Sequence, residues 1–304
     1  MKHSDSSLLH SQNQEENHSF SKQDKVSVAI LIVTFNSQRD LKQNLSFISH
    51  QIQLPDLVFV VDCASSSQDY LDEVESMPWP FTLNVKRLNA NQGYAGGNNL
   101  GLKYLAQRHF DYVLVLNPDA FLVSQDSIEQ LLKASQSLPQ PHLIAPLLMH
   151  FDRGSDQFSG AVDSAGLRQN ALGRWFDRLQ GQALPQHGSA PECVLGLCGA
   201  ALLMPASLIR SLILQRQDVF DSSFFMYKED IELSCYLNKI GVKQYLLWGV
   251  SVGHCRGWDK RRQSVSRWAR MLSAQNDVRV AWRYRWLSLP FTIAKYLAVK
   301  LFDM

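Results

Sequence analysis

Short apolar runs alternate with amphipathic stretches along the first 140 residues, and this alternation limits the fold more than any other feature of the chain. Strands are expected over residues 26–33, 57–61, 83–87 and 112–116, and later helices over 98–108 and 127–137. Residues 139–195 are less regular and are expected to form loops and short strands, and a further strand is expected over 242–247. After the first run, Leu41, Leu45 and Ile48 recur at helical spacing behind Ser37, a residue typical of helix N-caps. Strands that alternate with helices predict an α/β fold whose mostly parallel central sheet carries helices on both faces.

Composition divides the 304 residues into three parts. Residues 1–24 are polar, with Ser, Gln, Asn, Glu and His throughout and no secretory signal pattern, so we expect a disordered tail. Residues 25–255 contain the strand–helix alternation and form the main domain. Residues 256–304 hold eleven Lys or Arg and three Asp, a net charge of +8 in a chain whose total is +2. We expect this last part to be a basic helical extension.

The cysteines and the hydropathy pattern indicate a cellular setting. The five cysteines are scattered and none forms a C-x-x-C pair, so neither a zinc site nor a disulfide framework is favoured. Reduced cysteines are typical of the cytoplasm, where we expect the protein. No apolar run reaches the roughly 18–20 residues of a transmembrane helix. Any membrane contact is therefore expected to be peripheral, on the inner face.

Two of the expected strands stop on a carboxylate. Asp62 ends the second strand, and Asp119 follows the fourth strand after Asn117 and Pro118. Open α/β sheets bind ligands at the carboxyl ends of their strands, and oxygen ligands suit Mg²⁺ or Mn²⁺. Each acid can equally form a turn by bonding its own backbone. Position alone leaves both interpretations open for Asp62 and Asp119.

A polar, glycine-rich segment lies one helix before Asp119. It reads Asn-Gln-Gly-Tyr-Ala-Gly-Gly-Asn-Asn over residues 91–99. Glycines adopt positive φ and let a backbone approach a ligand, so we expect a turn that borders a nucleotide-linked substrate. The spacing does not match G-x-G-x-x-G after a first strand, which argues against a Rossmann dinucleotide site. The sequence contains no P-loop, H-E-x-x-H or G-x-S-x-G pattern.

Three acids gather at the expected start of a late helix. The aromatic-rich loop 224–228 is followed by Glu229, Asp230 and Glu232. The helix dipole stabilises acids at this position; beside a cleft, the same acids could include a general base. His254 comes just after the last expected strand. It could ligate a metal, contact a phosphate, or be an ordinary surface or core histidine.

In their order, these motifs resemble the inverting family 2 glycosyltransferases of the GT-A fold, and within them the rhamnosyltransferase-type branch. The matching segments are residues 28–36, 60–62, 91–99, 116–119 and 225–233, with 162–166 and 199–201 in addition. The likeness covers residues 26 to about 256. It implies a GT-A domain, a nucleoside-diphosphate sugar donor, and Mg²⁺ or Mn²⁺ as cofactor. It further implies a glycan or lipid-linked acceptor in cell-surface polysaccharide synthesis.

The resemblance also implies roles for individual residues. Asp230 would be the catalytic base, and Glu229 would orient the acceptor. Asp119 would take the metal-binding place of a D-x-D motif, and His254 would lie near the metal or the diphosphate. The residues implied for donor binding are Thr34, Asn36, Asp62, Gly93, Gly96, Gly97, Asn98 and Asn117.

Three positions depart from the family pattern. Asn117 replaces the first acid of a full D-x-D, Cys63 stands where Asn is common, and Cys255 stands where a second His is frequent. The replacement at Asn117 leaves one charged ligand in that motif. A nucleotide-sugar-binding protein without transfer activity would explain the missing acid but not the Glu-Asp pair. A nucleic-acid-binding protein would explain the basic extension but not the acids around the expected cleft.

The basic extension indicates an anionic partner. Four of the seven tryptophans lie in it, namely Trp258, Trp268, Trp282 and Trp286. Basic amphipathic helices with Trp lie in membrane interfaces, so an anionic membrane surface is favoured over nucleic acid. The alternative is that the aromatic residues pack on the main domain while the arginines are solvated. The sequence does not indicate an oligomeric state.

Overall fold

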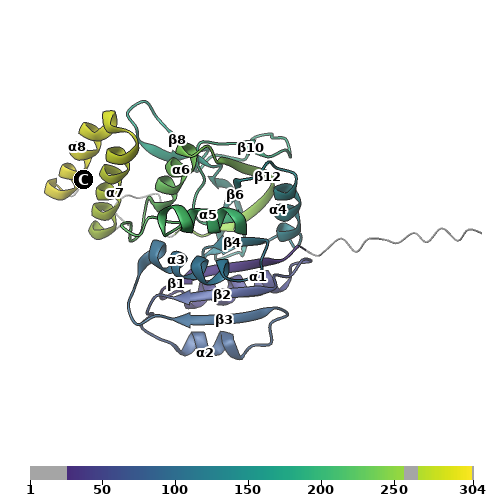
Figure 1. Cartoon of the computed structure of the whole chain (residues 1–304). Helices are drawn as coiled ribbons and strands as arrows, with labels where there is room; N and C mark the ends of the chain where they lie inside the picture. The colour runs from purple at the N-terminus through teal and green to yellow at the C-terminus, as the bar shows by residue number, and fades with distance from the viewer. Residues whose placement is uncertain (1–25, 257–265, 303–304) are drawn as a thin grey trace, which may run out of the picture.

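The structure is a computed structural model that describes residues 26–256 and 266–302. The polar tail expected over 1–24 and Trp258 of the basic extension lie outside the described residues. Figure 1 shows an α/β body with a pair of C-terminal helices at one side. The predicted α/β fold with a C-terminal helical extension is therefore confirmed.

A ten-stranded sheet runs through the body, and its main path has the order β10-β12-β6-β11-β4-β1-β2-β3. The bounds of these strands are β1 (Val28–Thr34), β2 (Leu57–Asp62), β3 (Thr82–Arg87), β4 (Tyr112–Leu116), β6 (His142–Asp152), β10 (Glu192–Cys193), β11 (Ala201–Pro205) and β12 (Lys243–His254). β11 is antiparallel to both of its neighbours, and β10 is antiparallel to β12. The other strands of the path run in one direction, which confirms a mostly parallel sheet.

Shorter strands extend this sheet and form a separate hairpin. They are β5 (Ala120–Phe121), β7 (Gln157–Ser164), β8 (Leu167–Gln169) and β9 (Trp175–Asp177). β5 pairs with β12, and β7 pairs with β6. β8 and β9 pair with each other in a two-stranded sheet. This hairpin carries Asp177, which forms an ion pair with Arg256.

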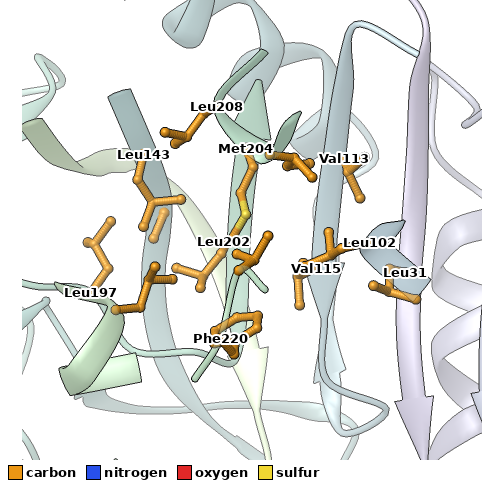
Figure 2. Close-up of a cluster of buried hydrophobic side chains, with 14 of the residues drawn as sticks. Leu31, Leu102, Val113, Val115, Leu143, Leu197, Leu202, Met204, Leu208 and Phe220 are labelled. Carbon is orange, nitrogen blue, oxygen red and sulfur yellow. The ribbon is translucent and has the colours of Figure 1, made fainter. Parts of the chain in front are cut away.

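Helices cover both faces of the sheet, as predicted. One core contains Ala29 and Leu31 of β1, and the other contains the alternate residues Val28, Ile30 and Ile32. The first core is covered by α3 (Gly93–Ala106), α5 (Ala206–Arg216) and α6 (Glu229–Lys239), and the second by α1 (Gln38–Ser49), α2 (Asp69–Ser76) and α4 (Ser127–Gln136). Figure 2 shows side chains of the first core between the strands and helices. β1 and β4 are apolar because both of their faces are covered.

Residues 93–99 differ from the expectation of a turn. They form the first two turns of α3, where Gly97 packs against Val33 and Gly101 packs against Leu31. A Cβ on Gly97 would lie 2.6 Å from a Val33 methyl group, and one on Gly101 would lie 2.3 Å from a Leu31 methyl group. These two glycines therefore let the helix lie close to β1.

The sequence also underestimates the strands after residue 139. A region expected to hold loops and short strands contains the long strand β6, and the strand expected over 242–247 continues to His254. Pro146 lies inside β6, where a proline normally argues against a strand. It pairs with Leu247, next to a register shift in β12. An irregularity at this point tolerates a residue that has no N–H to donate.

The extension consists of α7 (Arg267–Tyr284) and α8 (Leu289–Phe302), joined by a short 3₁₀ turn at Trp286–Ser288. The Arg267 guanidinium donates to the Lys300 carbonyl over 3.0 Å, so the two helices form an antiparallel hairpin. Within residues 26–256 and 266–302, no helix combines the length and the apolar character needed to cross a bilayer.

Candidate active site

The carboxyl ends of β1, β2 and β4 meet at one edge of the sheet. Thr34 and Asp62 end β1 and β2 at paired positions, and Asn117 follows β4. The start of α3 reaches the same edge, where the Cys63 thiol lies 3.7 Å from the Gly93 carbonyl oxygen. The fold thus brings together most of the residues implied for donor binding.

Asp62 is fully buried, and its carboxylate holds the loop that follows β2. It accepts hydrogen bonds from the Ser65 N–H at 3.0 Å and the Tyr70 hydroxyl at 3.2 Å, and a further one from the Ser65 hydroxyl. The exposed Asn36 has a left-handed backbone and accepts from the N–H of Ser66 in the same loop. Asp62 and Asn36 therefore shape this loop, which would form the nearest wall of a nucleotide pocket.

The start of α3 lies against the loop that precedes the Glu-Asp pair. Gly93 has a φ of +66°, and a Cβ there would lie 2.1 Å from the Phe225 carbonyl oxygen. Only glycine fits this contact. Asn98 is buried, its amide nitrogen donates to the Tyr94 carbonyl, and its side-chain oxygen has no hydrogen-bond partner among the described residues. Within the described part of the chain, Asn98 thus keeps one buried hydrogen-bond acceptor unused at the start of α3.

Asp119 begins a chain of alternating charges. Its Oδ1 lies 3.6 Å from Nε2 of His254, whose Nδ1 donates to Asp163 over 2.8 Å. The Arg256 guanidinium forms ion pairs with the carboxylates of Asp163 at 2.9 Å and Asp177 at 2.8 Å. Burial disfavours the imidazolium, but the carboxylates of Asp119 and Asp163 outweigh it and raise the pKa of His254 to about 9. His254 is therefore a cation at neutral pH in this arrangement.

Asp119 and His254 fit a divalent cation as a pair of protein ligands. The described residues contain no group of three or more His, Cys, Asp or Glu side chains that could hold an ion alone. However, Asp163 orients His254 through Nδ1, the arrangement that metal-binding histidines usually have, and leaves Nε2 facing Asp119. Mg²⁺ and Mn²⁺ sites commonly combine few protein ligands with substrate phosphates and water. Binding would require His254 to lose its proton.

Glu229 and Asp230 open α6, directly after Lys228 with its left-handed backbone. Asp230 is half-buried and accepts hydrogen bonds from the N–H groups of Gly199 at 3.2 Å and Ile231 at 2.8 Å. Burial, and then the charge of Asp177, raise the pKa of Asp230. Burial and the charge of Asp230 raise the pKa of Glu229 to about 8. Asp230 is thus the more accessible carboxylate of the pair.

The Gly199–Ala200 backbone joins the two halves of the site. The Gly199 N–H donates to Asp230, and its carbonyl accepts from the Tyr94 hydroxyl at 2.6 Å. The Ala200 carbonyl accepts from the N–H of Asn117 at 2.8 Å. Two adjacent residues therefore fix the acid pair, the start of α3 and the Asn-Pro-Asp segment relative to one another.

The basic extension holds the loop in front of the acid pair. Asn276 of α7 is fully buried, and its amide donates to the carbonyls of Met226 at 3.1 Å and Tyr227 at 2.8 Å. Asp277 lies 3.8 Å from the Lys228 ammonium. Arg279 donates to the Ser223 carbonyl over 2.6 Å. Polar side chains therefore attach this face of α7 to the main domain, whereas Trp282 and Trp286 are exposed.

Sequence reasoning missed several residues that complete the site. Asp163 lies inside a segment that matched the family, so its position gave a usable signal. Tyr94 lies within the glycine-rich segment but does not stand out as a hydrogen-bond donor. Asp177 and Asn276 come from a short strand and a basic helix that carry no motif, and only the tertiary structure brings them to the acid pair.

Comparison with known proteins finds one family model and several relatives that parts of this chain resemble. Residues 29–157 match the family model described as glycosyl transferase family 2. The low-salt glycan biosynthesis hexosyltransferase Agl10 of Haloferax volcanii is 28% identical over 213 residues, which are 69% of this chain and 60% of that protein. The rhamnosyltransferase WbbL of Escherichia coli is 22% identical over 173 residues, 56% of this chain and 63% of that one. The chain thus spans about three fifths of these curated relatives.

A solved structure also resembles the fold of this chain. The crystal structure of GalNAc-T7 with UDP, GalNAc and Mn²⁺ superimposes with a TM-score of 0.67 at 15% sequence identity. The match covers 90% of this chain and 52% of that one. It supports the architecture of the sheet and its helices.

Proposed function

We propose that this chain, which carries a family 2 glycosyltransferase domain of the GT-A fold, transfers a sugar from a nucleoside-diphosphate sugar to an acceptor hydroxyl and inverts the anomeric centre. The observation that carries the proposal is the Gly199–Ala200 junction. It holds a half-buried carboxylate, Asp230, beside the strand-end segment that contains Asp119. A base and a leaving-group site held in fixed relation are what a one-step displacement needs.

Asp230 would act as the general base. An acceptor hydroxyl is a poor nucleophile, and proton transfer to a positioned carboxylate makes its oxygen reactive. Each Asp230 oxygen accepts one backbone hydrogen bond and keeps a further lone pair. The hydroxyl proton moves to Asp230 while the oxygen bonds to the anomeric carbon. The bond from that carbon to the diphosphate breaks on the opposite face, which inverts the configuration.

The strand-end residues would stabilise the leaving diphosphate. Its negative charge grows as the glycosidic bond breaks, and fixed donors and cations lower the energy of that state. Asp119 and His254 would hold a divalent cation, which supplies positive charge to the diphosphate when bound. Arg153 pairs with Asp40 at 2.9 Å and brings a guanidinium to 3.9 Å from Asp119.

The two curated relatives guide the choice of substrates. One is named a glycan biosynthesis hexosyltransferase and the other a rhamnosyltransferase. We therefore propose a hexose or a deoxyhexose such as rhamnose as the transferred sugar. A glycan or lipid-linked glycan of a cell-surface polysaccharide would be the acceptor.

A ligand panel tests the donor side of this proposal. The full chain is heated with nucleoside diphosphates and nucleotide sugars, with and without Mn²⁺ or Mg²⁺, and nucleoside diphosphate release is measured in parallel. We expect a metal-dependent rise in melting temperature with one nucleotide series, because ligands that bind only the folded state stabilise it. Asp119→Ala should lose the metal-dependent part of that rise. If nucleotide sugars bind but no tested acceptor leads to release of nucleoside diphosphate, the chain is a nucleotide-sugar-binding protein instead.

A further inference from the structure

A second concave site lies away from the candidate active site, between the β8–β9 hairpin, α6 and the C-terminal helices. This groove has a volume of about 680 Å³. Its walls come from Trp175 of β9, Cys235 of α6, Val280 of α7 and Phe291 of α8. None of the residues that line it belongs to the candidate donor, metal or base sites. The groove is therefore a candidate binding site for a second ligand.

Positive charge dominates the lining of the groove. Arg174, Lys239, Arg283, Arg285 and Lys295 line it together with a single acid, Asp277. Arg283 is paired with Asp221, and Lys295 is paired with Asp277. Among the described residues, Arg174, Lys239 and Arg285 have no ion pair, and Arg285 donates to the Gln169 side-chain oxygen. Three cations without a counter-charge at one concave surface favour an anionic ligand.

An exposed apolar surface continues outward from the groove. Leu287 and Phe291 line the groove and are also exposed to solvent, Leu287 at 73%. Further large apolar side chains on the hairpin are exposed, namely Trp282, Trp286, Ile293, Leu297, Leu301 and Phe302. In α8, which lies on the outer side of the extension in Figure 1, only Thr292 and Val299 are buried. Exposed apolar surface of this extent marks an interaction site.

The chemistry of this surface matches a lipid bilayer better than a polar macromolecule. A nucleic acid would use the cations but would leave the apolar side chains uncovered. α8 has 14 residues, so it spans about 21 Å, less than the roughly 30 Å of a hydrocarbon core. The helix can therefore lie in a membrane interface, but it is too short to cross the bilayer. Tryptophan and leucine side chains beside cations are typical of such interfacial helices.

We propose that the α7–α8 hairpin docks on an anionic phospholipid bilayer, with the groove holding a lipid phosphate at Arg174 and Lys239 and the apolar face of α8 entering the interface. One side of α7 is already occupied, because Asn276 and Arg279 bind the loop before the acid pair. The groove adjoins this contact at Asp277, which lines the groove and also faces Lys228. The proposal does not depend on glycosyl transfer.

Vesicle co-sedimentation of the full chain tests the headgroup site. We expect binding to vesicles that contain phosphatidylglycerol and little binding to phosphatidylcholine alone. Arg174→Gln with Lys239→Gln should weaken binding about 30-fold, because each cation near an anionic surface contributes roughly a fivefold factor. The matched control, Lys86→Gln with Lys133→Gln, removes the same charge elsewhere. An equal loss in both variants would indicate general electrostatics and overturn the site.

A second pair of variants tests the apolar face. Trp286→Ser with Leu301→Ser should weaken vesicle binding about tenfold or more, whereas Ile52→Ser with Leu214→Ser, two exposed residues of the main body, should not. Unchanged melting temperatures and nucleotide responses show that each variant is folded. No binding by the unaltered chain, or equal binding to neutral and anionic vesicles, overturns the proposal. An intact nucleotide response in that case would leave the proposed function standing.

Discussion

Asp230 is the residue on which the proposed chemistry depends, and its surroundings suit a base. Burial and the charge of Asp177 raise its pKa, which makes the carboxylate a stronger proton acceptor than one in water. Two backbone N–H groups hold its oxygens in place. A raised pKa and oxygens held in place are properties that suit a general base.

Asp230→Asn keeps the shape of the side chain and removes its ability to accept a proton. We expect kcat to fall by roughly 10²–10⁴, the usual range for loss of a general base, while donor binding is retained. Initial rates and a nucleotide thermal-shift titration of the same preparation measure the two effects. If Glu229→Gln is inactive and Asp230→Asn remains active, the roles of the two acids are exchanged.

Glu229 predicts a pH dependence of stability. Its pKa of about 8 in the folded protein exceeds the roughly 4.3 expected for an unfolded chain. Between these values the folded state holds a proton that the unfolded state has released. The stability that this proton contributes is complete below the unfolded pKa and is lost as pH rises toward and through 8.

Glu229→Gln should therefore reduce the fall in melting temperature between mildly acidic and mildly alkaline buffer. Some of the fall should remain, since the pKa of Asp230 is also raised. Glu129→Gln, at an exposed position of α4, serves as the control and should follow the unaltered chain. Superimposable melting curves for all three proteins at every pH would contradict a protonated Glu229.

At the scale of elements, α7 supports the loop 224–228, which precedes Glu229 and Asp230. Tyr227 and Lys228 have left-handed backbones, which cost free energy in residues other than glycine. Asn276 satisfies the Tyr227 carbonyl, and Asp277 faces the Lys228 ammonium. The loop conformation that presents Asp230 thus depends on a helix far along the chain.

Asn276→Ala tests this dependence. It leaves two loop carbonyls without their donor, so we expect a loss of about 1–3 kcal/mol in the free energy of unfolding. A positioning role also predicts a lower kcat with an almost unchanged KM for the donor. Gln275→Ala, at the exposed neighbouring position, should alter neither quantity. Reduced stability with full kcat would restrict Asn276 to a structural role.

At the scale of the whole molecule, local sequence patterns predicted β1 to β4 and the helices α1, α3 and α4 within the first 140 residues, but they missed α2 and β5. β1, β2 and β4 are short apolar runs, and α1 repeats apolar residues at helical spacing. The cap was less well predicted, because the Ser37 hydroxyl donates to the Phe35 carbonyl instead of capping α1. β6 was hidden by Pro146, whose missing donor is accommodated beside an irregular part of β12.

The sequence predicted those candidate site residues that lie in motifs. It did not predict the contacts between them, because these depend on the tertiary structure. Asp119 and Asp230 follow recognisable segments, but their connection through Gly199 and Ala200 depends on the pairing of distant strands. The role of α7 could not be read from its sequence. Its arginines suggested a solvated or lipid-facing surface, whereas Arg279 binds the Ser223 carbonyl, just before the loop 224–228.

The anomeric configuration of the product tests the central claim most directly. With the best donor from the ligand panel and an acceptor that supports turnover, proton NMR follows the anomeric signals from the first minutes of reaction. A single displacement assisted by Asp230 predicts that the product has the opposite configuration to the donor at all times. Retention of the donor configuration in the first product formed would contradict the mechanism.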